Sequence, residues 1–477
     1  MEENTKNQDF LGTEPVGKLL FKLALPAIAD QLINVLYNIV DRVYLGHMKD
    51  VGGLALTGVG VCAPILMIIS AFAALVAMGG APLASIELGK QNREGAERIM
   101  GSCFALQVVL SLVLTAVCLI WNEPLLLLFG ASENTIPYAT QYINVYALGT
   151  IFVQLTLGMN AFISAQGFAK TSMLTTLIGA VCNIILDPIF IFACDMGVRG
   201  AALATVISQA ISCIWVLVFL HSEKSGLRLS AGTIRFRREL LSCMALGVAP
   251  FIMQASESVI SICFNSSLLK YGGDVAVGAM TILSTVFQFA MLPIQGLSQG
   301  AQPISGYNFG ARNGARVKKT FQLLLLCACV YATVLWGTIE LFPQVYAAMF
   351  TGDADIVRYT TVVLRIYAGA MCLMGVQIAC QMTFISMGNA KASVFLAVFR
   401  KFILLIPLIY LLPALLPDKA IAVYLAEPIA DTIAVLCTAL LFRHEFKKAL
   451  QAISEPHQQE HTLPCKANEQ RKGTKFM

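Results

Sequence analysis

Long apolar runs separated by short polar segments fill most of the chain. Each run is long enough to cross a hydrocarbon layer of about 30 Å as an α-helix. The pattern predicts twelve membrane-spanning helices, close to residues 19–45, 54–80, 98–120, 135–160, 171–193, 200–220, 240–266, 276–303, 319–341, 356–386, 393–413 and 419–442. The expected fold class is therefore an all-α polytopic membrane protein.

The first predicted helix carries a polar stripe on an otherwise apolar surface. The stripe consists of Asp30, Asn34, Asn38 and Asp41, which fall within an arc of about 80° at 100° per residue. Polar side chains inside a membrane need water or polar partners beside them. We therefore expect this face of the helix to line a hydrated space.

The second half of the chain repeats the first, at offsets of 221 to 224 residues. The matched pairs include Pro26 and Pro250, Asn92 and Asn313, Gly167 and Gly388, and Ser172 and Ser393. Each half then holds six helices, and because six is an even number, both halves enter the membrane from the same side. We expect two six-helix bundles related by a pseudo-two-fold axis along the membrane normal.

Composition and charge support a membrane protein and give its orientation. Hydrophobic residues make up 57% of the chain and charged residues only 13%, which excludes an ordinary soluble domain. Lys and Arg gather in one set of loops and near the chain ends, so the positive-inside rule places these loops and both termini in the cytoplasm. The net charge of +5 reflects this orientation, and no nucleic-acid partner is expected.

The apolar runs and the loop charges divide the chain into five parts and indicate its location. They are a cytoplasmic N-terminus (1–18), an N-terminal lobe (19–220), a cytoplasmic linker (221–238), a C-terminal lobe (239–442) and a disordered cytoplasmic tail (443–477). Residues 1–18 lack the apolar core of a cleavable signal peptide. We expect a monomeric, multi-pass protein of a bacterial inner (plasma) membrane, in contact with the lipid bilayer.

Ionisable residues inside the apolar runs differ between the two halves. Asp41 is paired with Asn265 and Glu257 with Ile33 at an offset of 224, and Asp187 is paired with Ile406 through the matched Leu-Asp-Pro and Leu-Ile-Pro segments. Charged side chains inside a bilayer cost several kcal/mol each and usually mark the route of an ion or a substrate. The two lobes are therefore expected to have different roles.

A candidate cation site lies in the N-terminal lobe. Pro188 breaks the fifth helix directly after Asp187 and leaves a backbone carbonyl oxygen without its usual partner. Helices one and five run in the same direction, which places Asp41 and Asp187 in the same half of the lobe. With Asn183 and Thr205 they would surround a small cation, or the two acids would share a proton. Interhelical hydrogen bonding is the alternative explanation.

Three segments resemble the multidrug and toxic compound extrusion (MATE) family, prokaryotic type. They are residues 34–42 (NVLYNIVDR), 183–188 (NIILDP) and 295–303 (QGLSQGAQP). The resemblance covers residues 15 to about 445. It implies two bundles around a central cleft, and export of amphiphilic, mainly cationic organic compounds against inward Na⁺ or H⁺. In the branch that this chain resembles most, the cation-coupling positions match Asp41, Asn183, Asp187 and Thr205.

Glu257 on the seventh helix is the main candidate for contact with the transported compound. It resembles one of two acids that form a cation site in another branch of the family, but the tenth helix, 356–386, has no second acid in its apolar middle. Glu257 is therefore expected to meet one positive charge on a bulky organic ion. A single protonatable group and a plain interhelical hydrogen bond are its alternatives. The other candidate substrate contacts are Met253, Gln254, Gln288, Met291, Asn34 and Asn38.

Two adjacent bases, Arg400 and Lys401, lie within the eleventh helix. We expect one to reach the cytoplasmic interface and the other to meet an acid across the bundle. Cysteines and histidines lack the spacing of metal ligands, so no metal site other than Na⁺ at the coupling site is expected. No cofactor and no catalytic residues are expected either.

Two other functions are alternatives to the export of organic cations. An exporter or flippase of a lipid-linked or other endogenous metabolite would need many Arg and Lys in the cleft to meet phosphates, whereas the polar residues here are mainly acids and amides. An intramembrane enzyme or receptor is a second alternative, although doubled lobes with a proline-broken acidic helix are more typical of transporters. The chain has no phosphate-binding loop of the kind that ATP-driven pumps use.

Overall fold

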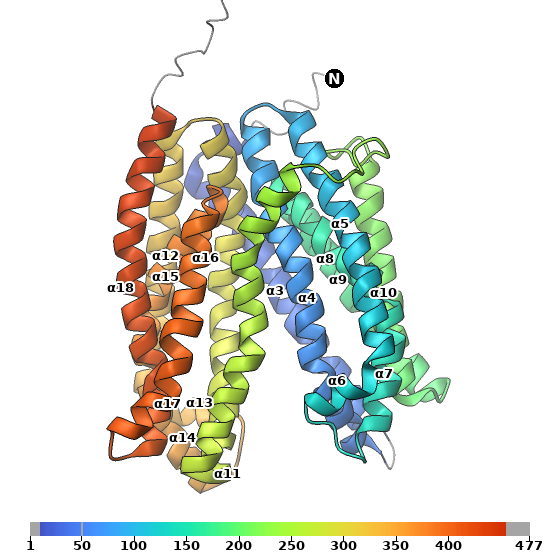
Figure 1. The fold of residues 1–477 in the computed structure, drawn as a ribbon, viewed down its shortest axis with the longest axis vertical. Coiled ribbons are helices and arrows are strands. Elements are labelled where there is room, and N and C mark those ends of the chain that lie inside the picture. The colour runs from blue at the N-terminus through green and yellow to red at the C-terminus, as the bar shows by residue number, and fades with distance from the viewer. Residues whose placement is uncertain (1–9, 49–50, 455–477) are drawn as a thin grey trace, which may run out of the picture.

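The structure, a computed structural model, describes residues 10–48 and 51–454. The regular elements of this part of the chain are helices (Figure 1). The first half contains α2 (Phe10–Thr13), α3 (Val16–Gly46), α4 (Gly52–Gly89), α5 (Arg93–Ile120), α6 (Asn122–Leu128), α7 (Ile136–Leu148), α8 (Thr150–Ala165), α9 (Ala169–Pro188), η1 (Ile189–Ala193) and α10 (Gly197–His221). The second half contains α11 (Glu239–Gly310), α12 (Gly314–Leu341), α13 (Pro343–Ala348), α14 (Ala354–Tyr367), η2 (Ala368–Leu373), α15 (Met374–Ser386), α16 (Ala390–Val398), η3 (Phe399–Leu405), α17 (Ile406–Leu415) and α18 (Lys419–Ser454).

The helices account for twelve membrane crossings. Among the described residues, ten helical segments are long and apolar enough to cross, and α7 with α8 forms one further span bent by 57°. One of the ten, α11, has 72 residues and would be about 108 Å long if it were straight. It is two helices that meet at Gly273, where φ is 66° and ψ is −161°. The expected all-α fold is confirmed.

The internal repeat is visible in local backbone geometry. Asn92 and Asn313 each begin a helix, and each side chain accepts a hydrogen bond from the backbone amide three residues further on. The residues directly before them, Gln91 and Arg312, have φ values of 61° and 57°, a conformation that non-glycine residues seldom adopt. The repeat predicted from sequence therefore extends to the details of equivalent loops.

The two lobes share an apolar cluster at one end of the molecule. This cluster joins buried residues of α3 and α4 to residues of α11 and α12, including Leu20, Val76, Leu297 and Leu324. Toward the opposite end, the buried residues separate into one cluster within each lobe. Figure 1 shows the bundles close together near the start of α3 and spread apart near α6 and α13. We call the joined end the basic end, because the Lys- and Arg-rich loops lie there, and the other the far end.

Glycine allows α4 and α11 to touch at the basic end. A Cβ atom on Gly247 would overlap the backbone of Leu75, and one on Gly310 would overlap the backbone of Ile86. At both positions the backbones of the two lobes are in direct contact, which only a residue without a side chain permits. The seam between the lobes therefore depends on these positions.

The linker between the lobes is fastened to the N-terminal lobe. The Leu227 amide donates to Gln166 Oε1 at 2.9 Å, and the Arg228 amide donates to Glu97 Oε1 at 3.0 Å. Ser102 Oγ donates to the carbonyl of Arg235 at 2.8 Å. These bonds hold the linker against α5 and α8 along most of its length.

The last helix is longer than expected. Phe442 and Phe446 stack at 4.8 Å, and both pack against Phe321 of α12. Because this apolar face continues past Arg443 to Phe446, α18 extends to Ser454. The expectation that residues 443–454 are disordered is therefore wrong. Residues 455–477 of the expected tail lie outside the described residues.

Gly247→Ala should destabilise the protein, since the new methyl group meets backbone that cannot rotate away. We expect a loss of about 1–3 kcal/mol, measured as a lower unfolding temperature in detergent. Gly278→Ala is the matched control, because Gly278 is also a helical glycine, in the second part of α11, and its Cβ would have nothing within 4 Å. Equal unfolding temperatures for the two variants would contradict a tight seam.

Candidate functional site

Two carboxyl groups meet inside the N-terminal lobe. Asp41 on α3 and Asp187 on α9 are in direct contact. Asn183 Nδ2 donates to Asp187 Oδ1 at 3.2 Å and to Thr205 Oγ1 at 3.4 Å. Asp187 is completely buried, and Asn183 and Thr205 are buried beside it. The structure therefore brings together the four residues predicted to couple a cation.

Several oxygens of this site have no hydrogen-bond partner in the described part of the chain. They are Asp41 Oδ1, Asn183 Oδ1 and Asp187 Oδ2. An unpaired buried acceptor costs roughly 1–3 kcal/mol, so native proteins normally supply a donor, a water or an ion. Carboxylate, amide and hydroxyl oxygens are suitable ligands for a small hard cation, and two facing carboxyl groups can also share one proton. The donor set fits either occupant.

A small polar cavity continues from this site toward the basic end. Its volume is about 40 Å³, which is enough for a single water molecule. Asn34 lines it together with Asn183 and Thr205. Asn38 has a different environment, because its side chain is exposed and its amide donates back to the carbonyl of Asn34 at 2.6 Å. The polar stripe of the first helix is therefore divided between the lobe interior and the exposed surface.

Five charged side chains form a network inside the C-terminal lobe, which we call the C-lobe charge cluster. Lys401 Nζ lies 2.8 Å from Glu257 Oε1. Arg400 contacts Asp431 Oδ1 at 2.6 Å through Nε and Glu427 Oε1 at 3.3 Å through Nη2. The Glu257 side chain is 54% exposed, whereas the other four are 13% exposed or less. The cluster is thus buried except at Glu257.

The expectation that Arg400 or Lys401 reaches the cytoplasmic interface is wrong. Both bases point into the bundle, and each pairs with acid on a different helix. They lie in the π-helical segment η3, whose wider turn is often found at functional positions in helices. Acids on both sides of the segment explain why neither base needs to extend toward solvent.

Glu427 and Asp431 are charged residues that the sequence analysis missed. They lie four residues apart in an apolar helix, on either side of Pro428. An acid beside a proline is the same signal that identified Asp187 and Pro188. The family resemblance points to the tenth helix for a second acid, whereas the buried acids of this lobe come from α18.

The other predicted substrate contacts are less closely connected to Glu257. Met253 lies four residues earlier in the same helix and is partly buried. Met291 packs against the apolar cluster shared by the lobes and against the separate apolar core of the C-terminal lobe. Gln254 and Gln288 are exposed, and no side-chain hydrogen bond between described residues joins either of them to Glu257. Their roles stay predictions.

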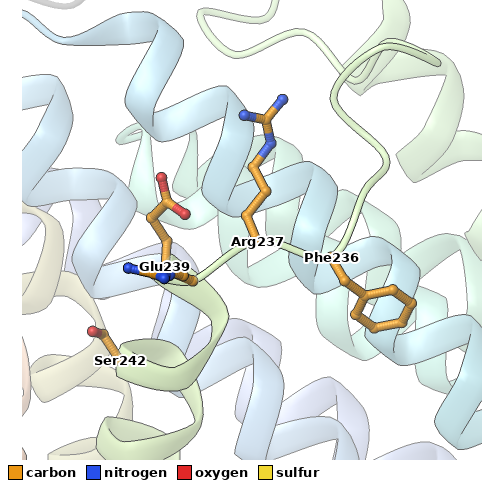
Figure 2. Close-up of a pocket in the computed structure, with 5 residues that line it drawn as sticks. Phe236, Arg237, Glu239 and Ser242 are labelled. Carbon is orange, nitrogen blue, oxygen red and sulfur yellow. The ribbon is translucent and has the colours of Figure 1, made fainter.

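A further depression of about 640 Å³ lies where the linker joins α11. It is lined by Phe236, Arg237, Arg238, Glu239 and Ser242. Figure 2 shows the labelled side chains of Phe236, Arg237 and Glu239 pointing in different directions rather than toward a common centre. This open surface feature is separate from both charged sites.

Comparisons with known proteins identify the family. A sequence model of the MatE family matches residues 26–189 and 250–411, one segment in each lobe. The chain belongs to the MatE family. Members of this family are transporters, so this MatE protein is a multi-pass membrane transporter and not an enzyme. The family needs no cofactor.

Individual relatives of this MatE protein are distant but cover nearly the whole chain. Multidrug export protein MepA of Staphylococcus aureus is 25% identical over 430 residues, which are 90% of this chain and 94% of MepA. A crystal structure of a MATE transporter in the bent conformation has a TM-score of 0.88 at 22% identity, covering 94% of this chain and 99% of that one. An outward-facing multidrug resistance MATE transporter has a TM-score of 0.85 at 22% identity, covering 93% and 99%. The fold is therefore shared over its full extent.

Arg400→Met should strongly destabilise this MatE protein, because it leaves two buried carboxylates without their partner. Breaking a buried ion pair in this way costs about 3–5 kcal/mol, which is measurable as a large drop in unfolding temperature. Arg365→Met is the control, since Arg365 lies 3.9 Å from Glu340 and is 52% exposed. A similar small effect for both variants would contradict a buried network.

Proposed function

We propose that this MatE protein is a secondary active exporter of amphiphilic, mainly cationic organic compounds, driven by inward movement of Na⁺ or H⁺. The observation that supports this proposal is the contact between Asp41 and Asp187, together with the unpaired oxygens around it. Two like charges in a low-dielectric interior favour a proton or a cation between them. The names of the relatives, which are multidrug export proteins, support an organic substrate.

Helix α3 provides a physical route from cation binding to the lobe interface. Asp41 lies in its far half, next to Asp187 of α9. In its basic half, Ile28 is so close to Gly296 of α11 that a Cβ atom on that glycine would meet its backbone. A cation or proton at the acid pair changes the attraction between α3 and α9, and any resulting shift of α3 acts directly on the seam. Coupling would therefore operate through one helix.

The arrangement of the lobes corresponds to an outward-facing state in this proposal. The shared apolar cluster closes the basic end, while the lobes have separate cores toward the far end. Because the positive-inside rule assigns the basic end to the cytoplasm, the far end would open to the outside. Export then requires the seam to open and the far end to close.

The charges inside the lobes do not favour a flippase of anionic lipid-linked precursors. The acid pair and the C-lobe charge cluster together contain five carboxyl groups and two bases. A phosphate-bearing substrate would be repelled by this excess of negative charge. Positively charged compounds fit the interior better.

Asp41→Asn and Asp187→Asn should each abolish coupled efflux while leaving expression unchanged. Either substitution removes one of the two charges that would hold the cation. The measurement is dye efflux from everted vesicles under separate Na⁺ and H⁺ gradients, which also identifies the driving ion. Glu133→Gln is the control, because Glu133 is an exposed acid in a loop. Wild-type efflux by either Asp variant would refute the shared site.

Cysteines introduced at Lys90 and Glu133 should report the orientation of the protein. Both positions are exposed, one in a loop of the basic end and the other in a loop of the far end. In intact cells, and in a background without accessible native cysteines, a membrane-impermeant maleimide should label only position 133. Labelling at position 90 alone would reverse the proposed topology.

A further inference from the structure

The C-lobe charge cluster is short of one positive charge. It contains three carboxylates, Glu257, Glu427 and Asp431, but only two bases. Arg400 lies between the two acids of α18, and Lys401 pairs with Glu257. When all five groups are ionised, the net charge is −1. Because an uncompensated charge in a protein interior is costly, a third positive charge would stabilise this lobe.

Glu257 is where that charge can arrive. It lies near the middle of the first half of α11, and its side chain is 54% exposed. Neighbouring residues face the other lobe, since Ser258 Oγ lies 3.7 Å from the Met67 sulfur and the rings of Phe251 and Phe72 are 5.0 Å apart. An accessible carboxylate at this depth needs water rather than lipid beside it. Glu257 therefore faces the space between the lobes.

The cluster also occupies a position related to the acid pair of the N-terminal lobe. Residues 201–208 of α10 and 423–430 of α18 have the same pattern of burial: at each of the eight matched positions, both residues are buried or both are partly buried. This places Glu427 at the position equivalent to Thr205. In the N-lobe site, two acids contact each other and neither forms an ion pair with a base among the described residues, although the charge of the exposed Arg42 acts on Asp41. In the C-lobe site, two buried bases contact the acids directly. The same region of the fold is therefore adapted to a different occupant.

We propose that the C-lobe charge cluster binds one monovalent cationic group of the transported compound, and that Lys401 sets its affinity and charge selectivity by competing for Glu257. This inference rests on the proposed export of organic cations. The three carboxylates are not arranged to hold a metal ion, since the described residues contain no group of three or more His, Cys, Asp or Glu side chains placed to bind one. An organic cation that reaches Glu257 instead replaces the Lys401 ammonium.

The displaced Lys401 has a second partner available. Its charge already acts on Glu427, which is held by Arg400 at 3.3 Å, while Arg400 keeps Asp431 at 2.6 Å. Lys401 moves toward Glu427 when the substrate pairs with Glu257. Three carboxylates then face three positive charges. A dication would overcompensate the cluster, so the site favours single charges.

Ethidium and propidium provide a direct test, because they share an aromatic core but carry one and two positive charges. Their binding to the full-length purified protein is measured in detergent by fluorescence, without any ion gradient. Lys401→Met changes the cluster from −1 to −2, so propidium should bind about tenfold more tightly, with a smaller gain for ethidium. Lys391→Met is the control, because Lys391 is an exposed base of α16 in the same span, and its affinities should be unchanged.

Two further variants test the pairing in the opposite direction. Glu257→Gln removes the acceptor and should weaken ethidium by about 10- to 100-fold, the effect of one charge-assisted contact. Lys401→Arg should hold Glu257 more firmly through its planar fork and weaken ethidium about threefold. If Lys401→Met does not give a monodisperse protein, these two variants test whether Lys401 competes with the substrate for Glu257.

The outcomes separate this inference from the proposed export function. Unchanged ethidium affinity in Glu257→Gln, or no gain for propidium in folded Lys401→Met, would overturn it even if efflux still depends on Asp41 and Asp187. Conversely, the expected shifts in dye binding would support it even if efflux proved independent of those two acids. In that case the coupling proposal alone would fail.

Discussion

An ionised side chain inside a bilayer is stable only when a counter-charge, a proton or water lies beside it. Both lobes of this MatE protein contain several carboxyl groups at membrane depth, and their arrangement follows from this constraint. In the N-terminal lobe, Asp41 and Asp187 face each other beside the neutral side chains of Asn183 and Thr205, and the charge of the exposed Arg42 also acts on Asp41. In the C-terminal lobe, covalently attached cations neutralise most of the charge.

This difference gives two lobes with the same architecture different charged interiors. A site whose acids form no ion pair with a base changes its charge state whenever a small ion enters or leaves. A site with fixed cations is held together permanently and responds mainly by exchanging partners. The repeat gives the two lobes the same arrangement of helices, and the charged side chains make the lobes chemically different.

Features that depend on hydropathy, on the internal repeat and on helix direction were predictable from sequence. Twelve apolar runs, the repeat and the convergence of Asp41, Asn183, Asp187 and Thr205 follow from hydropathy, offsets and the direction of the helices. The pairing of Glu257 with Lys401 was not predictable, because it joins residues 144 positions apart on helices whose rotation is set by packing. The helical extension to Ser454 was missed for a similar reason, since it depends on stacking between Phe446 and a side chain of another helix.

The attachment of the linker determines where the two lobes can pivot. Gln166, Glu97 and Ser102 fasten residues 227 to 235 to the N-terminal lobe, while Glu239 already begins α11. Most of the connecting segment is therefore held by the N-terminal lobe and is not a flexible linker. Torsional freedom between the lobes on this side therefore lies in the φ and ψ angles of the few residues from Arg235 to Glu239. Any rotation of one lobe against the other at this connection would therefore change the backbone conformation of these few residues rather than the fold of the whole linker.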